Sequence, residues 1–387
     1  MRRWFRAWIC VALLPAAALA QPVPAPPEPP PALDLHEQVV RIAVTVRDLY
    51  GREEKREIPV TIFRPDGGGP YPLVIMNHGR APADRRAAQG RARYEHLSRY
   101  LVNHGFVVML PTRVGYGETY GDFDPEDAGS CQSPRVEPMS MAAVTQVLAT
   151  LDHARRLPYV DAGRWLVMGQ SVGGLTAVAT VGSAPSGLIA GVNFAGGRGG
   201  NPQTQPGEPC NPGATARAWS RIAPNARAPM LWLYWRNDRY WGERYPQQWH
   251  AAWTEAGARA EFHQLPPSGD DGHNGLGADM DTWVPLFEKF ARSLGLDVGH
   301  WPARPPADAM VRVDDVSRVP LGAGARAAGY EKFLQSKQPR AFAISPSGAW
   351  AWATGDWAIG RALGNCQSRR GEICRLYAID DSVVWSR

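Results

Sequence analysis

The stretch that decides the fold is Trp-Leu-Val-Met-Gly-Gln-Ser-Val-Gly-Gly, residues 165–174. It begins as a short apolar run typical of a buried strand, and small residues follow that can pack closely as a helix. Ser171 stands between Gly169 and Gly173. In so tight a turn, side chains at both flanking positions would collide with neighbouring backbone, so both favour glycine. We therefore expect a sharp strand-to-helix bend that lifts the serine hydroxyl above the sheet edge.

Such a bend also aims the N-terminus of the following helix at the hydroxyl. Backbone donors and the positive end of the helix dipole then lie where an oxyanion would form. The pattern alone is weak in a chain with 40 glycines, and the alternative is a glycine-rich turn around an ordinary serine. The context of an apolar strand before and a small-residue helix after is what favours the functional interpretation.

Length and charge limit the classes of protein. The 387 residues suffice for one large domain of about 250–280 residues and a smaller one. The formal net charge is +5, but Arg2, Arg3 and Arg6 supply three of the positive charges and the first twenty residues hold no acid. The remaining basic residues are scattered and mostly arginine, which argues against a nucleic-acid surface.

The first twenty residues have the pattern of a signal peptide. A basic start precedes an apolar run at 7–14, and Ala18-Leu19-Ala20 fits a cleavage site before Gln21. The run is too short to anchor the chain in a bilayer, so we expect export to the periplasm or medium with no membrane span after cleavage. The incomplete twin-arginine pattern favours the general secretory route. Residues 21–36 are rich in proline and predict a stiff linker.

Four cysteines remain after the signal peptide, and an even number in an exported chain suggests disulfides. Of the three possible pairings we favour the two that each lie within one predicted domain. These are Cys131–Cys210 and Cys366–Cys374. The first would tie together two long loops, 115–138 and 196–229, over the serine. No set of residues resembles a metal site.

The order of predicted elements indicates an α/β fold over residues 37–297. Residues 39–46 and 58–63 predict an antiparallel hairpin. Apolar runs then alternate with helical stretches, which indicates a mainly parallel central sheet with helices on both faces. The runs are 72–77, 106–110, 165–168, 188–194, 230–235 and 261–265, and the helices are 84–103, 139–156, 175–181, 246–256 and 281–294.

A proline-rich linker at 298–308 separates this unit from a small accessory module at 309–387. There we expect a helix at 330–334, strands at 341–344 and 349–354, and a closing hairpin from 376 to 385. The module is α+β and contains no recognisable chemistry.

A serine nucleophile needs a base oriented by an acid, and in this architecture they follow the serine in the order acid, histidine. Four histidines follow Ser171. His273 lies in a flexible loop after the last strand, from which it can reach back over the sheet. The other three fit a helix, a strand and the linker: His250, His263 and His300.

Asp238 is the predicted acid because it stands just past the strong strand 230–235, at the sheet edge where ligands bind. Asp270 and Asp271 compete, but their closeness to His273 in sequence makes the geometry harder. The amides of Val172 and Arg80 are the predicted oxyanion donors. His78 is interpreted as orienting the loop that carries Arg80.

Together His78-Gly79, 169–174, 237–240 and 271–273 resemble the α/β-hydrolase superfamily, and are most similar to its secreted bacterial dienelactone hydrolase-like branch. The resemblance covers about residues 37–297 and implies a triad of Ser171, Asp238 and His273. The dienelactone hydrolases proper carry cysteine as nucleophile, where this chain has serine.

These residues predict an exported serine hydrolase that cleaves carboxylic esters through an acyl-enzyme, with no metal or organic cofactor. A small-molecule ester is the expected partner, with a weak preference for aromatic or acid-bearing esters from four loop residues: Arg113, Tyr116, Tyr240 and Trp241. A peptidase of the prolyl-peptidase type and a non-catalytic envelope binding protein are the alternatives. The oligomeric state is not indicated.

Overall fold

The structure is a computed structural model that describes most of the chain after the proline-rich linker. The described residues are 28, 31–32, 35–65, 67–296, 307–308, 310–355, 358–370, 372 and 374–385. The predicted signal peptide, most of the 21–36 linker and most of the 298–308 linker lie outside these residues. Within the described part, none of the helices is long and apolar enough to cross a membrane.

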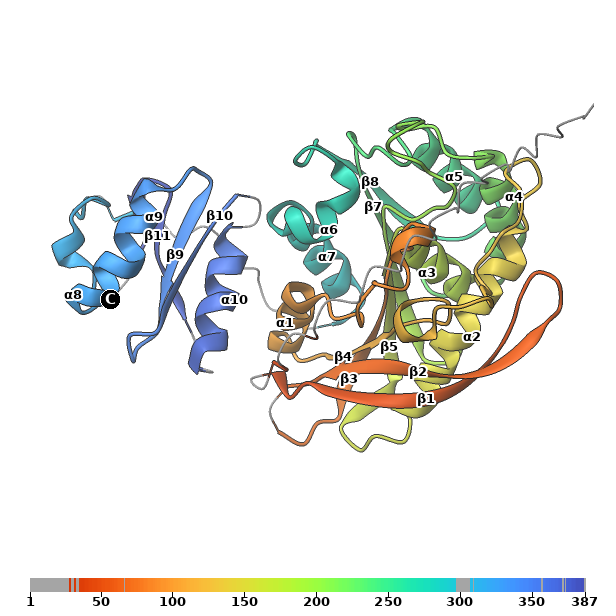
Figure 1. Cartoon of the computed structure of the whole chain (residues 1–387), viewed down its shortest axis with the longest axis horizontal. Helices are drawn as coiled ribbons and strands as arrows, with labels where there is room; N and C mark the ends of the chain where they lie inside the picture. The colour runs from red at the N-terminus through yellow and green to blue at the C-terminus, as the bar shows by residue number, and fades with distance from the viewer. Residues whose placement is uncertain are drawn as a thin grey trace, which may run out of the picture.

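A sheet of eight strands forms the centre of the large unit (Figure 1). The strands lie in the order β1 (Gln38–Arg47), β2 (Glu53–Phe63), β4 (Val107–Pro111), β3 (Tyr71–Asn77), β5 (Val160–Gln170), β6 (Leu188–Phe194), β7 (Met230–Trp235) and β8 (Ala260–Leu265). The pairings β1–β2 and β2–β4 are antiparallel, and the rest are parallel. The predicted hairpin and mainly parallel sheet are confirmed.

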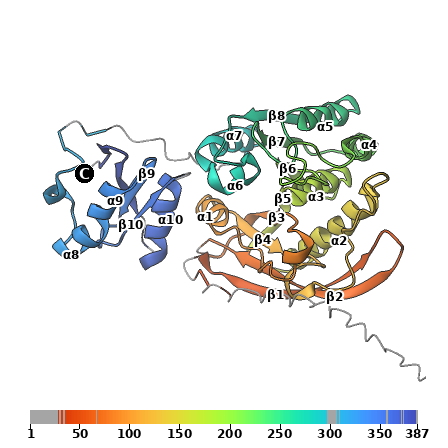
Figure 2. The same cartoon turned by 45° about the horizontal axis from the view of Figure 1, so that its top comes forward.

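Helices cover both faces of this sheet (Figure 2). One face carries α2 (Val136–Ala154), α3 (Val172–Gly182), α4 (Pro212–Ile222) and α5 (Arg244–Glu255). The other carries α1 (Glu95–Asn103), α6 (Gly275–Ala278) and α7 (Met280–Ser293). Because both faces are buried, β3 is apolar without interruption: Leu73 and Ile75 face one core, and Val74 and Met76 face the other.

The helix predicted over 84–103 is much shorter than expected. After a 3-10 turn at Ala83–Arg85, the chain runs irregularly until α1 begins at Glu95. The reason lies in the sheet below: the Ala92 N–H donates to Thr112 Oγ1 at 2.8 Å, and Thr61 Oγ1 donates to the Ala92 carbonyl at 2.7 Å. Threonine side chains thus bind the backbone groups that a helix would have paired internally.

The long segment 196–229 is not all loop, because it contains α4. Asn211 caps this helix by accepting a hydrogen bond from the Ala214 N–H at 3.2 Å, and Pro212 occupies its first turn. An Asn-Pro start is a recognised helix signal that the sequence interpretation missed. Trp219 on α4 is buried in the core.

The C-terminal part forms a second, antiparallel sheet. Its strands lie in the order β10 (Trp350–Thr354), β9 (Arg340–Ile344), β11 (Arg375–Ile379) and β12 (Ser382–Val383). The helix α9 (Glu331–Gln335) follows a short helical turn, α8 (Ala323–Ala325), and a π-helical turn at Arg326–Tyr330. The predicted α+β character is confirmed, but α10 (Ala358–Arg370) was missed. Small residues spaced four apart, Ala358, Ala362 and Cys366, form the stripe that packs on the sheet.

Helix α10 also contacts the large unit. In both views it lies beside α1 (Figures 1 and 2). Asn103 Nδ2 donates to Gln367 Oε1 at 3.4 Å, and a Cβ at Gly364 would lie 3.2 Å from Arg99 Cδ. Among the described residues, the two units therefore meet where α10 lies against α1.

Both predicted disulfides are present. Cys131–Cys210 joins the two long loops across 79 residues of sequence, with a Cα–Cα distance of 5.5 Å. Cys366–Cys374 closes a short loop of separation 8 between α10 and β11, with a Cα–Cα distance of 6.1 Å. Each bond lies within one of the two sheet units.

The two disulfides should differ in their effect on stability. A cross-link that closes a longer loop removes more entropy from the unfolded chain. Replacing both Cys131 and Cys210 by serine should lower the free energy of unfolding by about 4.5 kcal/mol, against about 2.5 kcal/mol for the Cys366 and Cys374 pair. Urea titration followed by tryptophan fluorescence measures this, and a larger loss for the second pair would contradict the loop-entropy argument.

Candidate active site

Ser171 lies at the sharp bend that the sequence predicts. Its backbone has φ 57° and ψ −123°, a rare conformation for a residue with a side chain. A Cβ at Gly169 would lie 1.9 Å from the Gly173 carbonyl oxygen, and one at Gly173 would lie 2.1 Å from the Asn77 carbonyl oxygen. Both glycines are therefore required for the close passage of β5, α3 and the end of β3.

Asp238 and His273 form a direct contact beside this bend. Asp238 follows β7, and His273 lies in a 3-10 turn, Gly272–Asn274, after β8. The His273 Nδ1 atom lies 3.0 Å from Asp238 Oδ2 and 3.2 Å from Oδ1. Both side chains are buried, at 7% and 2% exposure. Because Nδ1 is turned to the carboxylate, Nε2 is the ring nitrogen left for the pocket that His273 lines with Ser171.

The backbone holds Asp238 in place. Its Oδ1 accepts hydrogen bonds from the Tyr240 and Trp241 N–H groups at 2.8 and 3.1 Å. The competing Asp271 instead uses Oδ1 to accept the N–H groups of His273 and Arg239, both at 3.0 Å. Asp271 thus shapes the turn, and Asp270 is exposed.

The other histidines after the serine lie elsewhere. His250 Nε2 contacts the Ala260 carbonyl at 3.0 Å, and His263 pairs with Glu261 at 2.7 Å near the surface. His300 lies outside the described residues.

The loop after β3 lies directly against the serine. A Cβ at Gly79 would be 3.3 Å from Ser171 Cβ, so only glycine fits without displacing its neighbour. The Gly79 carbonyl is 2.7 Å from His78 Nδ1. Because the peptide is planar and trans, fixing this carbonyl also fixes the Arg80 N–H on the opposite side. Val172, whose amide is the other predicted donor, begins α3 next to Ser171.

His78 is held as a neutral ring. The Arg113 N–H donates to His78 Nε2 at 3.0 Å, so the proton of the neutral ring resides on Nδ1, which donates to Gly79. Burial, together with the nearby Arg113 charge, holds the pKa of His78 well below its usual value. His78 therefore orients the loop, in agreement with its predicted role.

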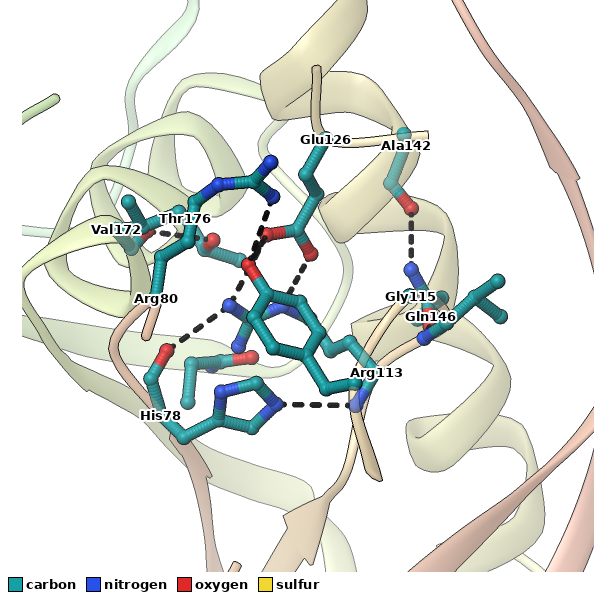
Figure 3. A network of polar contacts seen from close by, with 12 residues as sticks. His78, Arg80, Arg113, Gly115, Glu126, Ala142, Gln146, Val172 and Thr176 are labelled. Carbon is teal, nitrogen blue, oxygen red and sulfur yellow. Dashed lines mark hydrogen bonds and ion pairs between the residues drawn. The ribbon is translucent and has the colours of Figure 1, made fainter. Parts of the chain in front are cut away.

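A buried ion pair supports the same loop from behind (Figure 3). The Arg113 guanidinium donates to the His78 carbonyl at 2.9 Å and to both oxygens of Glu126. Glu126 also accepts the Tyr116 hydroxyl at 2.7 Å. The Arg80 guanidinium reaches Tyr116 at 3.2 Å and pairs with Asp124.

This network changes the interpretation of two predicted substrate contacts. Arg113 and Tyr116 have no exposed surface, and neither lines the pocket of Ser171 and His273. In this structure they support the loop from its buried side. The sequence interpretation missed Glu126, whose distance of thirteen residues from Arg113 follows no motif.

Tyr240 and Trp241 pack on the imidazole of His273. The Tyr240 ring is stacked on it with centroids 4.0 Å apart, and Trp241 meets it edge-on at 5.5 Å. Tyr240 lines the pocket, whereas Trp241 is only 1% exposed and its Nε1 donates to the Ala195 carbonyl at 2.6 Å.

The pocket beside Ser171 is a cavity of about 460 Å³. One wall is the irregular segment 89–94, which the sequence interpretation assigned to a helix. Arg80, Arg91 and Arg93 line it, and none of the aspartates and glutamates that the structure describes does. Arg91 and Arg93 share the buried Glu37 at 2.8 and 2.6 Å. Burial alone would raise the pKa of Glu37, but its hydrogen bonds from Arg93, the Ala32 N–H and Arg91 hold it below its usual value.

Comparison with known proteins identifies the family of this chain. Residues 58–269, more than half of the chain, match the dienelactone hydrolase family. A candidate dienelactone hydrolase from Klebsiella pneumoniae is 18% identical, with 68% of this chain and all of that chain covered and a TM-score of 0.43. An esterase from Pyrococcus furiosus is 13% identical, covers 70% and 95%, and has a TM-score of 0.48. No sequence among curated proteins matches this chain.

An acylaminoacyl peptidase from Pyrococcus horikoshii is also similar, at 12% identity and a TM-score of 0.45, with 69% of this chain and 43% of that chain covered. The sheet order and the helices on both faces define an α/β-hydrolase. More particularly, the chain belongs to the dienelactone hydrolase family and is a hydrolase. Among the described residues, no group of three or more acidic, histidine or cysteine side chains is arranged to hold a metal ion.

The neutral state of His78 should make stability depend on pH. The unfolded chain binds a proton at His78 below about pH 6.5, whereas the folded chain does not until a much lower pH. The contribution of His78 is therefore present above that pH and lost below it, at up to about 1.4 kcal/mol per pH unit. His78→Gln should reduce this slope of unfolding free energy between pH 6.5 and 5, measured by urea titration at each pH. An equal slope in the wild-type protein and His78→Gln would contradict the assignment.

Proposed function

We propose that the protein is a serine hydrolase that cleaves carboxylic esters with Ser171 as nucleophile, His273 as base and Asp238 as the orienting acid. The contact of Asp238 with His273 Nδ1, in a pocket that His273 shares with Ser171, carries this proposal. The rare backbone conformation of Ser171 supports it, because strain of this kind concentrates at functional sites.

In the proposed mechanism His273 Nε2 takes the Ser171 proton as the oxygen attacks the ester carbonyl. Asp238 holds the imidazole tautomer and stabilises its positive form. The amides of Val172 and Arg80 bind the oxyanion, and His273 then gives its proton to the leaving alcohol. Water attacks the acyl-enzyme by the same steps, which releases the acid and frees Ser171.

We also propose that the protein works outside the cytoplasm. The two disulfides support this, since such bonds persist in oxidising compartments. The signal-peptide pattern of residues 1–20 agrees with it.

Labelling by a fluorophosphonate probe tests the nucleophile. The wild-type protein should react with the probe and hydrolyse p-nitrophenyl acetate, and Ser171→Ala should lose both. Asp238→Asn should lower kcat by about 10⁴, the loss seen when a triad acid is neutralised. Ser183→Ala, at the other end of α3, is the matched control and should label like wild type. Labelling that survives in Ser171→Ala would end the proposal.

Peptide amides provide the second arm of this test. A matched p-nitroanilide peptide should be cleaved much more slowly than the ester. Faster cleavage of the amide would replace the esterase proposal by a peptidase that uses the same residues.

The charge of the pocket wall predicts a substrate preference. Among the described residues, three arginines line the pocket, and the four acids that pair with them, Glu28, Glu37, Glu95 and Asp124, are not lining residues. An ester whose acyl group ends in a carboxylate should be preferred about five- to tenfold in kcat/KM over a neutral ester of equal length. The preference should shrink at high salt and in Arg91→Gln. A preference for the neutral ester would contradict it.

A further inference from the structure

A chain of three hydrogen bonds connects two loops beside Ser171. One is the loop after β3 that carries Gly79 and Arg80, here called the oxyanion loop, and the other is the loop that carries the proposed base, His273. The Gly79 N–H donates to the Tyr94 hydroxyl at 3.3 Å. The Tyr94 hydroxyl donates to Gln170 Oε1 at 3.2 Å, and Gln170 Nε2 donates to the His273 carbonyl at 2.8 Å. The chain thus passes directly beside Ser171, whose neighbour is Gln170.

The direction of this chain is fixed from both ends. A backbone N–H can only donate and a backbone carbonyl can only accept. Tyr94 must therefore accept from Gly79 and donate to Gln170, and the Gln170 amide must turn its oxygen to Tyr94 and its nitrogen to His273. Burial raises the pKa of Tyr94, which keeps the donating proton on its hydroxyl. Only a side chain with one acceptor and one donor, such as an amide, completes the connection.

The backbone of Tyr94 is adapted to this position. Tyr94 precedes α1 with φ 41° and ψ 52°, in the left-handed region that residues with side chains seldom occupy. Such a conformation persists only where surrounding contacts hold it. Tyr94, Gln170 and Gly79 all line the pocket.

We propose that Tyr94 and Gln170 are positioning residues that set the oxyanion loop and the base at a fixed separation on either side of Ser171, an inference that rests on the proposed serine mechanism. Neither residue needs to touch the substrate. They set the positions of the Arg80 amide and His273 relative to the reacting carbonyl. Their loss should therefore lower kcat rather than weaken substrate binding.

Tyr94→Phe and Gln170→Met test the two links. Each should lower kcat for p-nitrophenyl acetate about three- to tenfold and leave KM within about twofold, the effect of losing one hydrogen bond at a reacting centre. The double variant should lose little more than either single variant, because the same chain is broken once. Wild-type kcat in both single variants would overturn the proposal.

Gln170→Glu gives a readout that a structural role would not move. An ionised carboxylate cannot donate to the His273 carbonyl, but a protonated carboxyl can donate to it and accept from Tyr94. The ratio of variant to wild-type kcat/KM should therefore rise as the pH falls from 8 to 5. The other titratable or charged groups among the described residues that line the pocket are present in both proteins: His78, Arg80, Arg91, Arg93, Tyr94, Tyr240 and His273. A ratio independent of pH would overturn the proposal.

Two controls separate the possible failures. Tyr100→Phe removes another buried hydroxyl, on α1, that contacts Glu288 at 3.2 Å and belongs to a residue that does not line the pocket. Tyr100→Phe should lower thermal stability without changing kcat. If it lowers kcat as much as Tyr94→Phe does, the loss in Tyr94→Phe reflects general destabilisation, and the inference is overturned. Ser171→Ala isolates the mechanism: activity that survives it overturns the serine mechanism together with the inference, whereas activity lost there but unchanged in Tyr94→Phe overturns the positioning role alone.

Discussion

The close passage of three backbone segments at Ser171 is the constraint on which the site depends. Strand β5, helix α3 and the end of β3 approach so closely that a Cβ at Gly169 or Gly173 would overlap backbone oxygens. This approach sets Ser171 in its rare conformation and brings Gly79 against it. Because the parallel strands all end at the same edge, the loops after β3, β7 and β8 can reach the serine from three sides.

The buried ion pair that supports the loop after β3 carries an electrostatic cost. Arg113 and Glu126 are both fully buried, and removing two charges from water costs several kcal/mol per ion before their attraction offsets it. An apolar pair would fill the same space with less penalty. The guanidinium, however, also binds the His78 carbonyl, and the Arg113 N–H selects the tautomer of His78. The pair thus specifies one conformation of the loop, which apolar packing alone would leave free.

The sequence predicts those parts of the molecule whose causes are local. Residues 165–174 contain the strand, the bend and the glycines, so both the fold and Ser171 follow from them. Asp238 and His273 follow from strand ends and chain order. Glu126, Tyr94 and Gln170 do not, because no sequence motif links any of them to its partner: Glu126 is thirteen residues from Arg113, and the hydroxyl of Tyr94 meets Gln170 across 76 residues. The prediction of a helix over 84–103 was wrong for the same reason, because Thr61 in β2 and Thr112 just after β4 bind the backbone of Ala92.

The C-terminal sheet of β9 to β12 packs mainly with the helices beside it in sequence. Helix α10 packs on one face of this sheet and α9 on the other. The apolar residues of the sheet are thus covered by helices of the same unit. Helix α10 contacts α1 through the Asn103–Gln367 hydrogen bond, and the apolar clusters of the two units are separate. Yet α1 is the helix that Tyr94 precedes, at the wall of the pocket. Helix α10 thus contacts a helix whose preceding residue, Tyr94, lines the pocket of Ser171 and His273.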